Sequence, residues 1–272
     1  MEIITNFLYQ LIFTVGVIVA FGLLIALCRK AFCQIVGENG TKILLITGII
    51  GTPIHELSHA LMCIIFGHKV DEIQLYEPDS DEGTLGYVCH SYNERNLYHQ
   101  IGNFFIGVAP LLCGSGVLLL LMWLLVPDVC SEVMSELQFI GLLSTDFLDP
   151  STYAGYLDLF CEVISDIFDF TNLGDIRWWI FIVLALMISS HMELSAADIK
   201  GGFTGFLFLA GILLALDVIL YFVYPPALDS VTTAMSTVAL PTASVLAISG
   251  IFSGVMVLIA LAVKGVIKIV NK

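Results

Sequence analysis

The sequence predicts an all-α polytopic membrane protein with about six transmembrane helices and a small membrane-associated β-hairpin after the second span. Three observations lead to this class. Hydrophobic residues make up 58% of the 272-residue chain and charged residues only 12%, whereas soluble domains average about 45–50% apolar and about 25% charged residues. Apolar runs of about 20 residues, long enough to cross a bilayer as a helix, recur along the chain. One polar segment between two runs alternates as paired strands do.

The apolar runs place six predicted spans along a single membrane domain of residues 1–272. They cover residues 5–28, 43–67, 97–126, 177–192, 203–224 and 242–263. The third contains Pro110 and several glycines, which is typical of a kinked or partly re-entrant helix. The fourth is short, so the join that follows it, "SSHMELSAADIKGG", is a candidate for dipping into the membrane.

Two connections between spans have a pattern of their own. Residues 68–92, "HKVDEIQLYEPDSDEGTLGYVCHSY", contain two alternating stretches around a polar turn, which predicts a hairpin. Residues 127–176 carry ten Asp or Glu and no Lys or Arg, which predicts an acidic extramembrane loop. Within this loop an acidic stripe predicts an amphipathic helix. The simpler interpretation of the stripe is a face exposed to solvent. The more specific one is a lid or an element that docks a partner. The stripe consists of Asp158, Glu162, Asp166 and Asp169.

Charge limits the partners and the orientation of the chain. A formal net charge of −14 argues against nucleic acid, which needs a basic binding surface. Six spans would place both termini on one side of the membrane. That side would collect six Lys or Arg and the other side four, so the positive-inside rule favours cytoplasmic termini.

The stretch "GTPIHELSHALMCIIFG", residues 51–67, places His55, Glu56 and His59 inside an apolar segment. Residues four apart share one face of a helix, so both histidines can bind one ion, and Glu56 can reach a water on that ion. This is the H-E-x-x-H arrangement of zinc hydrolases, in which the metal lowers the pKa of its water to about 7 and the carboxylate acts as general base. The three side chains could instead satisfy one another in a packed bundle. Ionisable residues within a span are usually functional, which favours the metal site.

This helix and its continuation, "HALMCIIFGHKVDEIQLY", resemble the site-2 protease family of intramembrane zinc metalloproteases, in particular its bacterial six-span branch. The resemblance covers roughly residues 43–126 and continues more loosely to about 205, so residues 43–205 would form the protease-like core. It implies a bacterial cell-membrane enzyme that cleaves membrane-anchored or membrane-proximal peptides, with zinc on His55 and His59 and with Glu56 as catalytic base. It also implies that Asn103 holds substrate or the oxyanion, although this amide could equally hydrogen-bond a neighbouring helix.

The third zinc ligand departs from the family pattern, because the sequence lacks an N-P-x-P-x-x-D-G-like stretch. Asp198 in "LSAADIKGG" is the nearest equivalent, although Ser195 and Asp198 would also form a capping box that starts a helix. Asp217, within the apolar "GILLALDVILYF", is the rival, and His191 and Glu193 are further candidates. The missing motif also leaves open a catalytically inactive relative that serves as a metal-binding scaffold, partner subunit or transporter.

Partners follow from this interpretation. The expected partners are a membrane peptide substrate, the lipid bilayer and an accessory membrane protein, with the substrate paired as a strand on the hairpin edge. The remaining histidines at connections, namely His68, His90 and His99, are expected to face solvent.

Overall fold

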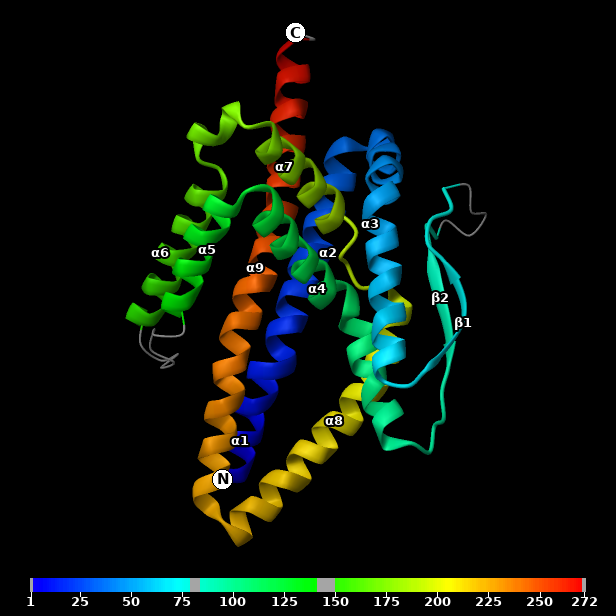
Figure 1. Cartoon of the computed structure of the whole chain (residues 1–272), viewed down its shortest axis with the longest axis vertical. Coiled ribbons are helices and arrows are strands. Elements are labelled where there is room, and N and C mark those ends of the chain that lie inside the picture. Colours follow the sequence, from blue (N-terminus) through cyan, green and yellow to red (C-terminus); the bar gives the residue numbers. More distant parts are fainter. Residues whose placement is uncertain (1, 79–83, 141–149, 271–272) are drawn as a thin grey trace.

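The structure is a computed structural model that describes residues 2–78, 84–140 and 150–270, and within these residues the protein is a helical bundle with one β-hairpin at its side (Figure 1). The all-α membrane class with a hairpin is confirmed. The helical elements are α1 (Glu2–Leu11), η1 (Ile12–Gly16), α2 (Val17–Val36), α3 (Glu38–Ile65), α4 (Leu97–Leu125), α5 (Pro127–Ile140), α6 (Pro150–Ile167), η2 (Phe170–Gly174), α7 (Ile176–Ser189), α8 (Ala196–Val223) and α9 (Pro225–Val270).

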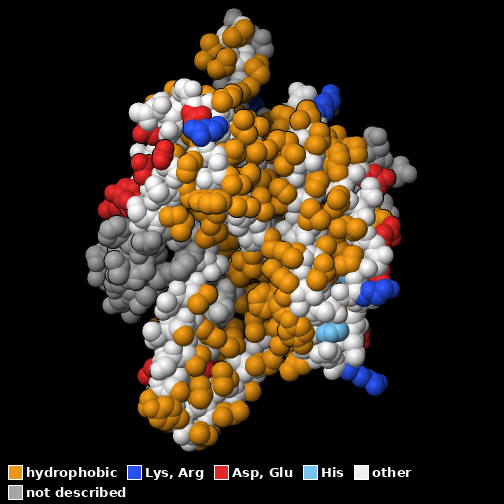
Figure 2. Space-filling view, viewed as in Figure 1, with side chains coloured by type: hydrophobic (Ala, Val, Ile, Leu, Met, Phe, Trp, Pro, Cys, Tyr) orange, Lys and Arg blue, Asp and Glu red, His pale blue; other side chains and the backbone are white. Residues whose placement is uncertain are grey.

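Five helical segments among the described residues are long and apolar enough to cross a membrane. Four correspond to α3, α4, α8 and α9, and the fifth, Ile3–Val36, joins α1 and α2 through the π-helical turn η1. On the face seen in Figure 2, hydrophobic side chains dominate and the charged ones lie near the rim. Length and composition therefore support a multi-pass membrane protein.

The predicted span 177–192 corresponds to α7, which has only 14 residues. Such a helix is about 21 Å long, less than the roughly 30 Å of bilayer hydrocarbon. The helix packs on α3 and ends beside the middle of the bundle, where the join dips inward and α8 begins (Figure 1). By its length α7 is therefore a shorter apolar helix and not a full span.

The two termini lie toward opposite ends of the long axis, with the start of α1 at one end and the end of α9 at the other (Figure 1). The five spans that are long and apolar enough among the described residues would give this arrangement, because their number is odd. The side of the membrane on which each terminus lies stays a prediction.

The predicted hairpin is present as β1 (Lys69–Gln74) and β2 (Tyr87–Ser91), which pair antiparallel. It begins just after α3 and runs back along that helix (Figure 1). The chain reverses direction at Gly67, whose φ of 72° is a backbone conformation that residues other than glycine rarely adopt. Farther along, the Tyr76 hydroxyl donates to the carbonyl of Leu45 over 2.6 Å, which ties the hairpin to α3.

The largest apolar core forms where α4 passes between α7 and α9. Leu111 and Leu118 of α4 are fully buried, as are Phe181 of α7 and Phe252 of α9. The two phenylalanine rings meet edge to face, with centroids 5.6 Å apart. α4 is thereby held firmly in the bundle, and it is one of the three helices that build the site described next.

The acidic loop folds as α5 and α6, which lie side by side next to the bundle (Figure 1). Val163 and Ile167 are buried while Asp158 and Glu162 are exposed, so α6 is amphipathic as predicted. Asp169, expected on the same stripe, lies beyond the end of α6 and instead caps η2. Residues 141–149 of this loop lie outside the described residues.

Candidate metal centre

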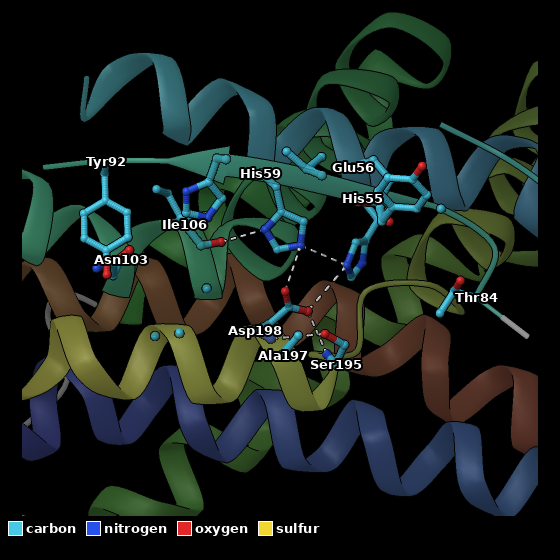
Figure 3. A pocket seen from close by; sticks show the side chains of 17 residues that line it. His55, Glu56, His59, Thr84, Tyr92, Asn103, Ile106, Ser195, Ala197 and Asp198 are labelled. Carbon is cyan, nitrogen blue, oxygen red and sulfur yellow. Dashed lines mark hydrogen bonds and ion pairs between the residues drawn. The ribbon is translucent and has the colours of Figure 1, made fainter. Parts of the chain in front are cut away.

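His55 and His59 lie on one face of α3 (Figure 3), and a backbone carbonyl orients each ring. Nδ1 of His55 lies 2.7 Å from the carbonyl oxygen of His191, and Nδ1 of His59 lies 2.8 Å from that of Ile106. A carbonyl oxygen only accepts, so each Nδ1 carries the proton. In the neutral rings, Nε2 of each histidine therefore presents a lone pair, which is the arrangement found in metal-binding histidines.

Asp198, at the start of α8, completes a group of three donors with the two histidines (Figure 3). The two Nε2 atoms are 3.1 Å apart, Asp198 Oδ1 is 3.2 Å from Nε2 of His59, and Oδ2 is 3.7 Å from Nε2 of His55. Three acceptors this close repel one another unless a proton or a metal ion lies between them. Tetrahedral zinc with bonds of about 2.0–2.1 Å would separate its donors by about 3.3 Å. The three residues thus fit a metal ion.

Asp198 also caps α8, so its two predicted roles, metal ligand and helix cap, are compatible. Oδ2 accepts from the backbone N–H of Ser195 over 2.7 Å, and Ser195 Oγ accepts from the backbone N–H of Asp198 over 3.1 Å. The cap holds one carboxylate oxygen and leaves Oδ1 directed at His59. A carboxylate with one oxygen fixed in this way is oriented before any ion arrives.

The other three ligand candidates lie elsewhere. Asp217 is 19 residues farther along α8, about 28 Å at 1.5 Å per residue, and its Oδ1 accepts from Gln10 Nε2 over 2.9 Å. Glu193 forms an ion pair with Arg29 of α2. The ring of His191 lies between two threonine hydroxyls of α3, and only its backbone carbonyl reaches the group.

A cavity of about 370 Å³ opens beside the three donors. Glu56 lines it, is 6% exposed, and is not one of the three donors. The hairpin covers this side of the site, since a Cβ placed on Gly86 would lie 2.9 Å from Cγ of Glu56. The hairpin side of the cavity is formed by Thr84, Gly86, Tyr87, Val88 and His90. A buried carboxylate therefore lines a partly open cavity next to the donors.

Asn103 is buried on α4 and lines the same cavity, one turn before Ile106 (Figure 3). Its amide nitrogen lies 3.5 Å from Oε1 of Gln100 on the same helix. This long contact leaves the amide directed toward the cavity and not committed to a neighbouring helix.

Glycine contacts between helices bring these elements close together. A Cβ on Gly107 of α4 would lie 2.6 Å from the carbonyl oxygen of Asp198 and 2.8 Å from Cα of Gly202. On the other side of α3, a Cβ on Gly51 would lie 2.6 Å from Cδ2 of His191. Small residues at helix crossings permit this approach. These glycine contacts set how far Asp198 and the carbonyl of His191 lie from His55 and His59.

Sequence reasoning did not anticipate a second group of metal-type donors, formed by Cys63, His68 and His90. His68 is only 4% exposed, and burial lowers the pKa of its imidazole, so the prediction of a solvated ring was wrong. The reason is that the hairpin folds back over the end of α3. Cys63 follows His59 by four residues, and this helical spacing is the signal that could have drawn attention to it.

Comparison of the chain with protein-family models, with curated proteins and with solved structures finds no match. The donors, the buried carboxylate and the cavity that they line are therefore the features that bear on function.

Proposed function

We propose that the protein is an intramembrane zinc metalloendopeptidase similar to the site-2 protease family. The observation that carries the proposal is the convergence of three metal-type donors, His55, His59 and Asp198, next to a buried glutamate that is not one of the three. Two imidazoles and one carboxylate leave a coordination position open, as catalytic zinc sites do. Structural zinc sites usually have four protein donors, so this set favours chemistry over a purely structural role.

The roles of the chain's own groups follow from their places. A bound zinc ion supplies a water of lowered pKa and polarises the peptide carbonyl. Glu56 accepts a proton from the attacking water as oxygen bonds to the carbonyl carbon, and it delivers that proton to the amine as the C–N bond breaks. Asn103 donates an amide hydrogen to the carbonyl oxygen while negative charge develops there.

The hairpin supports a peptide as the substrate. Among the described residues β2 pairs only with β1, and residues of β2 line the cavity. An extended peptide can add to such an edge through backbone hydrogen bonds, which exposes its carbonyl groups. Since the site lies between apolar helices, a membrane-anchored or membrane-proximal peptide has the most direct access.

The test is a hydrolysis assay in proteoliposomes with randomised peptides fused to one apolar helix, read by mass spectrometry of the products. Glu56→Gln should lower turnover at least about 100-fold, since general-base catalysis contributes about 10²–10⁴, and should keep the zinc content of the native protein. Glu162→Gln, on the exposed face of α6, is the matched control.

Two results would contradict the proposal. Full turnover in Glu56→Gln would remove the carboxylate from the chemistry, and with it the proposed general-base mechanism. Iron in place of zinc in the native protein would indicate oxygen chemistry, because two histidines and a carboxylate also suit Fe(II).

A further inference from the structure

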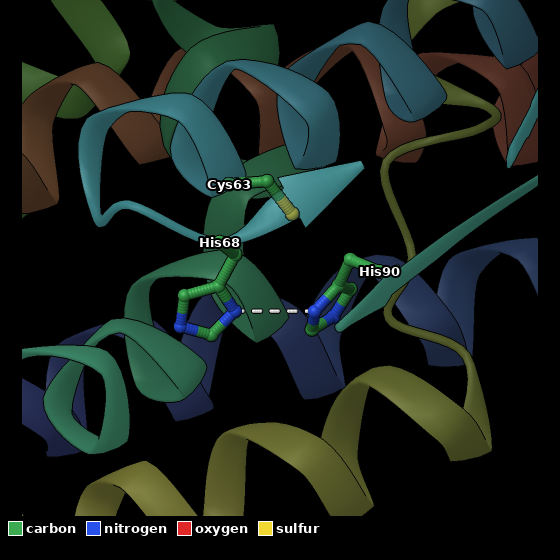
Figure 4. A group of neighbouring side chains, drawn as sticks. All are labelled: Cys63, His68 and His90. Atoms are coloured by element: carbon green, nitrogen blue, oxygen red, sulfur yellow. Dashed lines mark hydrogen bonds between the residues drawn. The ribbon is translucent and has the colours of Figure 1, made fainter. Parts of the chain in front are cut away.

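Cys63, His68 and His90 form a compact group at the junction of α3 and the hairpin (Figure 4). Their nearest donor atoms all lie within 4.8 Å of one another. Cys63 and His68 are buried, at 0% and 4% exposure, and His90 is half-buried. The group contains a sulfur donor, which distinguishes it from the His55, His59 and Asp198 group.

The local chain path explains why the three residues meet. Cys63 lies one turn beyond His59 on α3, and the backbone N–H of His68 donates to the carbonyl of Cys63 over 2.8 Å as the helix ends. This reversal returns His68 to the side of Cys63. Strand pairing then brings His90, because it lies opposite Val70 in the hairpin register.

Hydrogen bonds fix the state of one ring. Nε2 of His68 lies 2.9 Å from the carbonyl oxygen of His99, so this nitrogen carries the proton and Nδ1 presents a lone pair. That lone pair points at Nδ1 of His90, 3.1 Å away (Figure 4). Tyr92 stacks on the His68 ring, with centroids 4.6 Å apart, and holds its plane. The ring is thus oriented by a carbonyl on one side and an aromatic face on another.

We propose that Cys63, His68 and His90 form a second metal site, which takes a thiolate-binding divalent ion of the zinc type. The spacing of the two ring nitrogens suits zinc, whose nitrogen donors lie about 3.3 Å apart, and the sulfur would close to about 3.5 Å for bonds of about 2.3 Å. An ion there would connect α3 through Cys63, the turn after α3 through His68, and β2 through His90. A softer thiolate donor also gives this site a different metal preference from the first.

The position suggests what the ion does. His90 lines the cavity that Glu56 also lines, so a metal on His90 holds β2 against α3. The role of such an ion in holding the cavity wall rests on the proposed function, whereas the existence of the site does not. The ion would then act as a clamp that keeps the wall of the cavity in place.

Cobalt spectroscopy of the full chain in detergent tests the site directly. The metal-free protein is titrated with Co²⁺, and a thiolate-to-cobalt charge-transfer absorption in the near ultraviolet is recorded. The His55, His59 and Asp198 group has no sulfur and does not produce this band. We expect the band in the native protein and in His55→Ala/His59→Ala, saturating at one equivalent in the latter, and its loss in Cys63→Ser. Cys33→Ser, which removes a half-buried cysteine of α2, should keep it.

The native spectrum alone can overturn the proposal, so the result does not depend on any variant folding. Absence of the charge-transfer band in the native protein would reduce the group to a hydrogen-bonded histidine pair beside a buried thiol. A band that survives in Cys63→Ser would also overturn it, because another cysteine would then hold the metal. Failure of the proposed function is distinguishable, since the Glu56→Gln assay reads turnover and this band does not require it.

Discussion

The backbone carbonyl of His191 accepts a hydrogen bond from Nδ1 of His55 over 2.7 Å. Through this bond the join between α7 and α8 orients a donor on α3. The imidazole of His191 is in turn held by the hydroxyls of Thr47, 3.0 Å from Nε2, and Thr52, 3.4 Å from Nδ1. A side chain outside the group of His55, His59 and Asp198 thereby positions one within it.

Replacing His191 by alanine is expected to weaken metal binding at the His55, His59 and Asp198 group by about 10–100-fold, the usual effect of losing an outer partner. The physical reason is that the join loses its two anchors on α3 and its carbonyl drifts from His55. Competition with a chromophoric chelator, in a Cys63→Ser background, measures this affinity alone. Thr237→Val, on an exposed face of α9, is the control, and unchanged affinity in His191→Ala would refute the positioning role.

Asp198 and Asp217 should respond differently to alanine. Asp198→Ala removes a donor and should abolish zinc retention through gel filtration. Asp217→Ala should keep zinc but lower the free energy of unfolding by about 1–3 kcal/mol, because the buried amide of Gln10 loses its carboxylate partner. Elemental analysis and thermal unfolding report the two effects. The assignment fails if Asp198→Ala keeps its zinc and Asp217→Ala loses it.

The glycine contact between α4 and α8 sets the place of Asp198. Gly107→Ala forces these helices apart, because its Cβ would lie 2.6 Å from the Asp198 carbonyl oxygen. We expect a lower melting temperature and at least tenfold weaker zinc binding. Gly116→Ala, on the same helix with no atom within 4 Å of its Cβ, should change neither. Equal behaviour of the two variants would show that the close approach does not position Asp198.

Gly86 allows the hairpin to pack against the proposed catalytic base. Alanine at this position would place Cβ 2.9 Å from Cγ of Glu56 and displace the carboxylate. Turnover should fall about 10–100-fold, since small misplacements of a catalytic group have effects of this size, while zinc content stays that of the native protein. Gly174→Ala, which has open space around it, is the control. Normal turnover in Gly86→Ala would separate the hairpin from the chemistry.

The features that the sequence predicted are those set by short-range geometry. Helical spacing alone places His55 and His59 on one face with Glu56 beside them, and strand alternation alone predicts the hairpin. Apolar runs predict the long spans because the bilayer requires a minimum length. Each of these depends on a pattern within one continuous stretch of the sequence, so each could be recognised without any knowledge of packing.

Only the tertiary structure decided which acid joins the histidines. Asp198 and Asp217 both follow the short α7, and their separation from the histidines depends on where α7 ends and how closely α8 packs on α4. The glycine contacts, the inward join and the carbonyls of His191 and Ile106 determine that geometry. The sequence alone determined two donors and a carboxylate on one helix. Contacts between residues more than 40 positions apart determined the third donor, because helix packing and not local periodicity controls such distances.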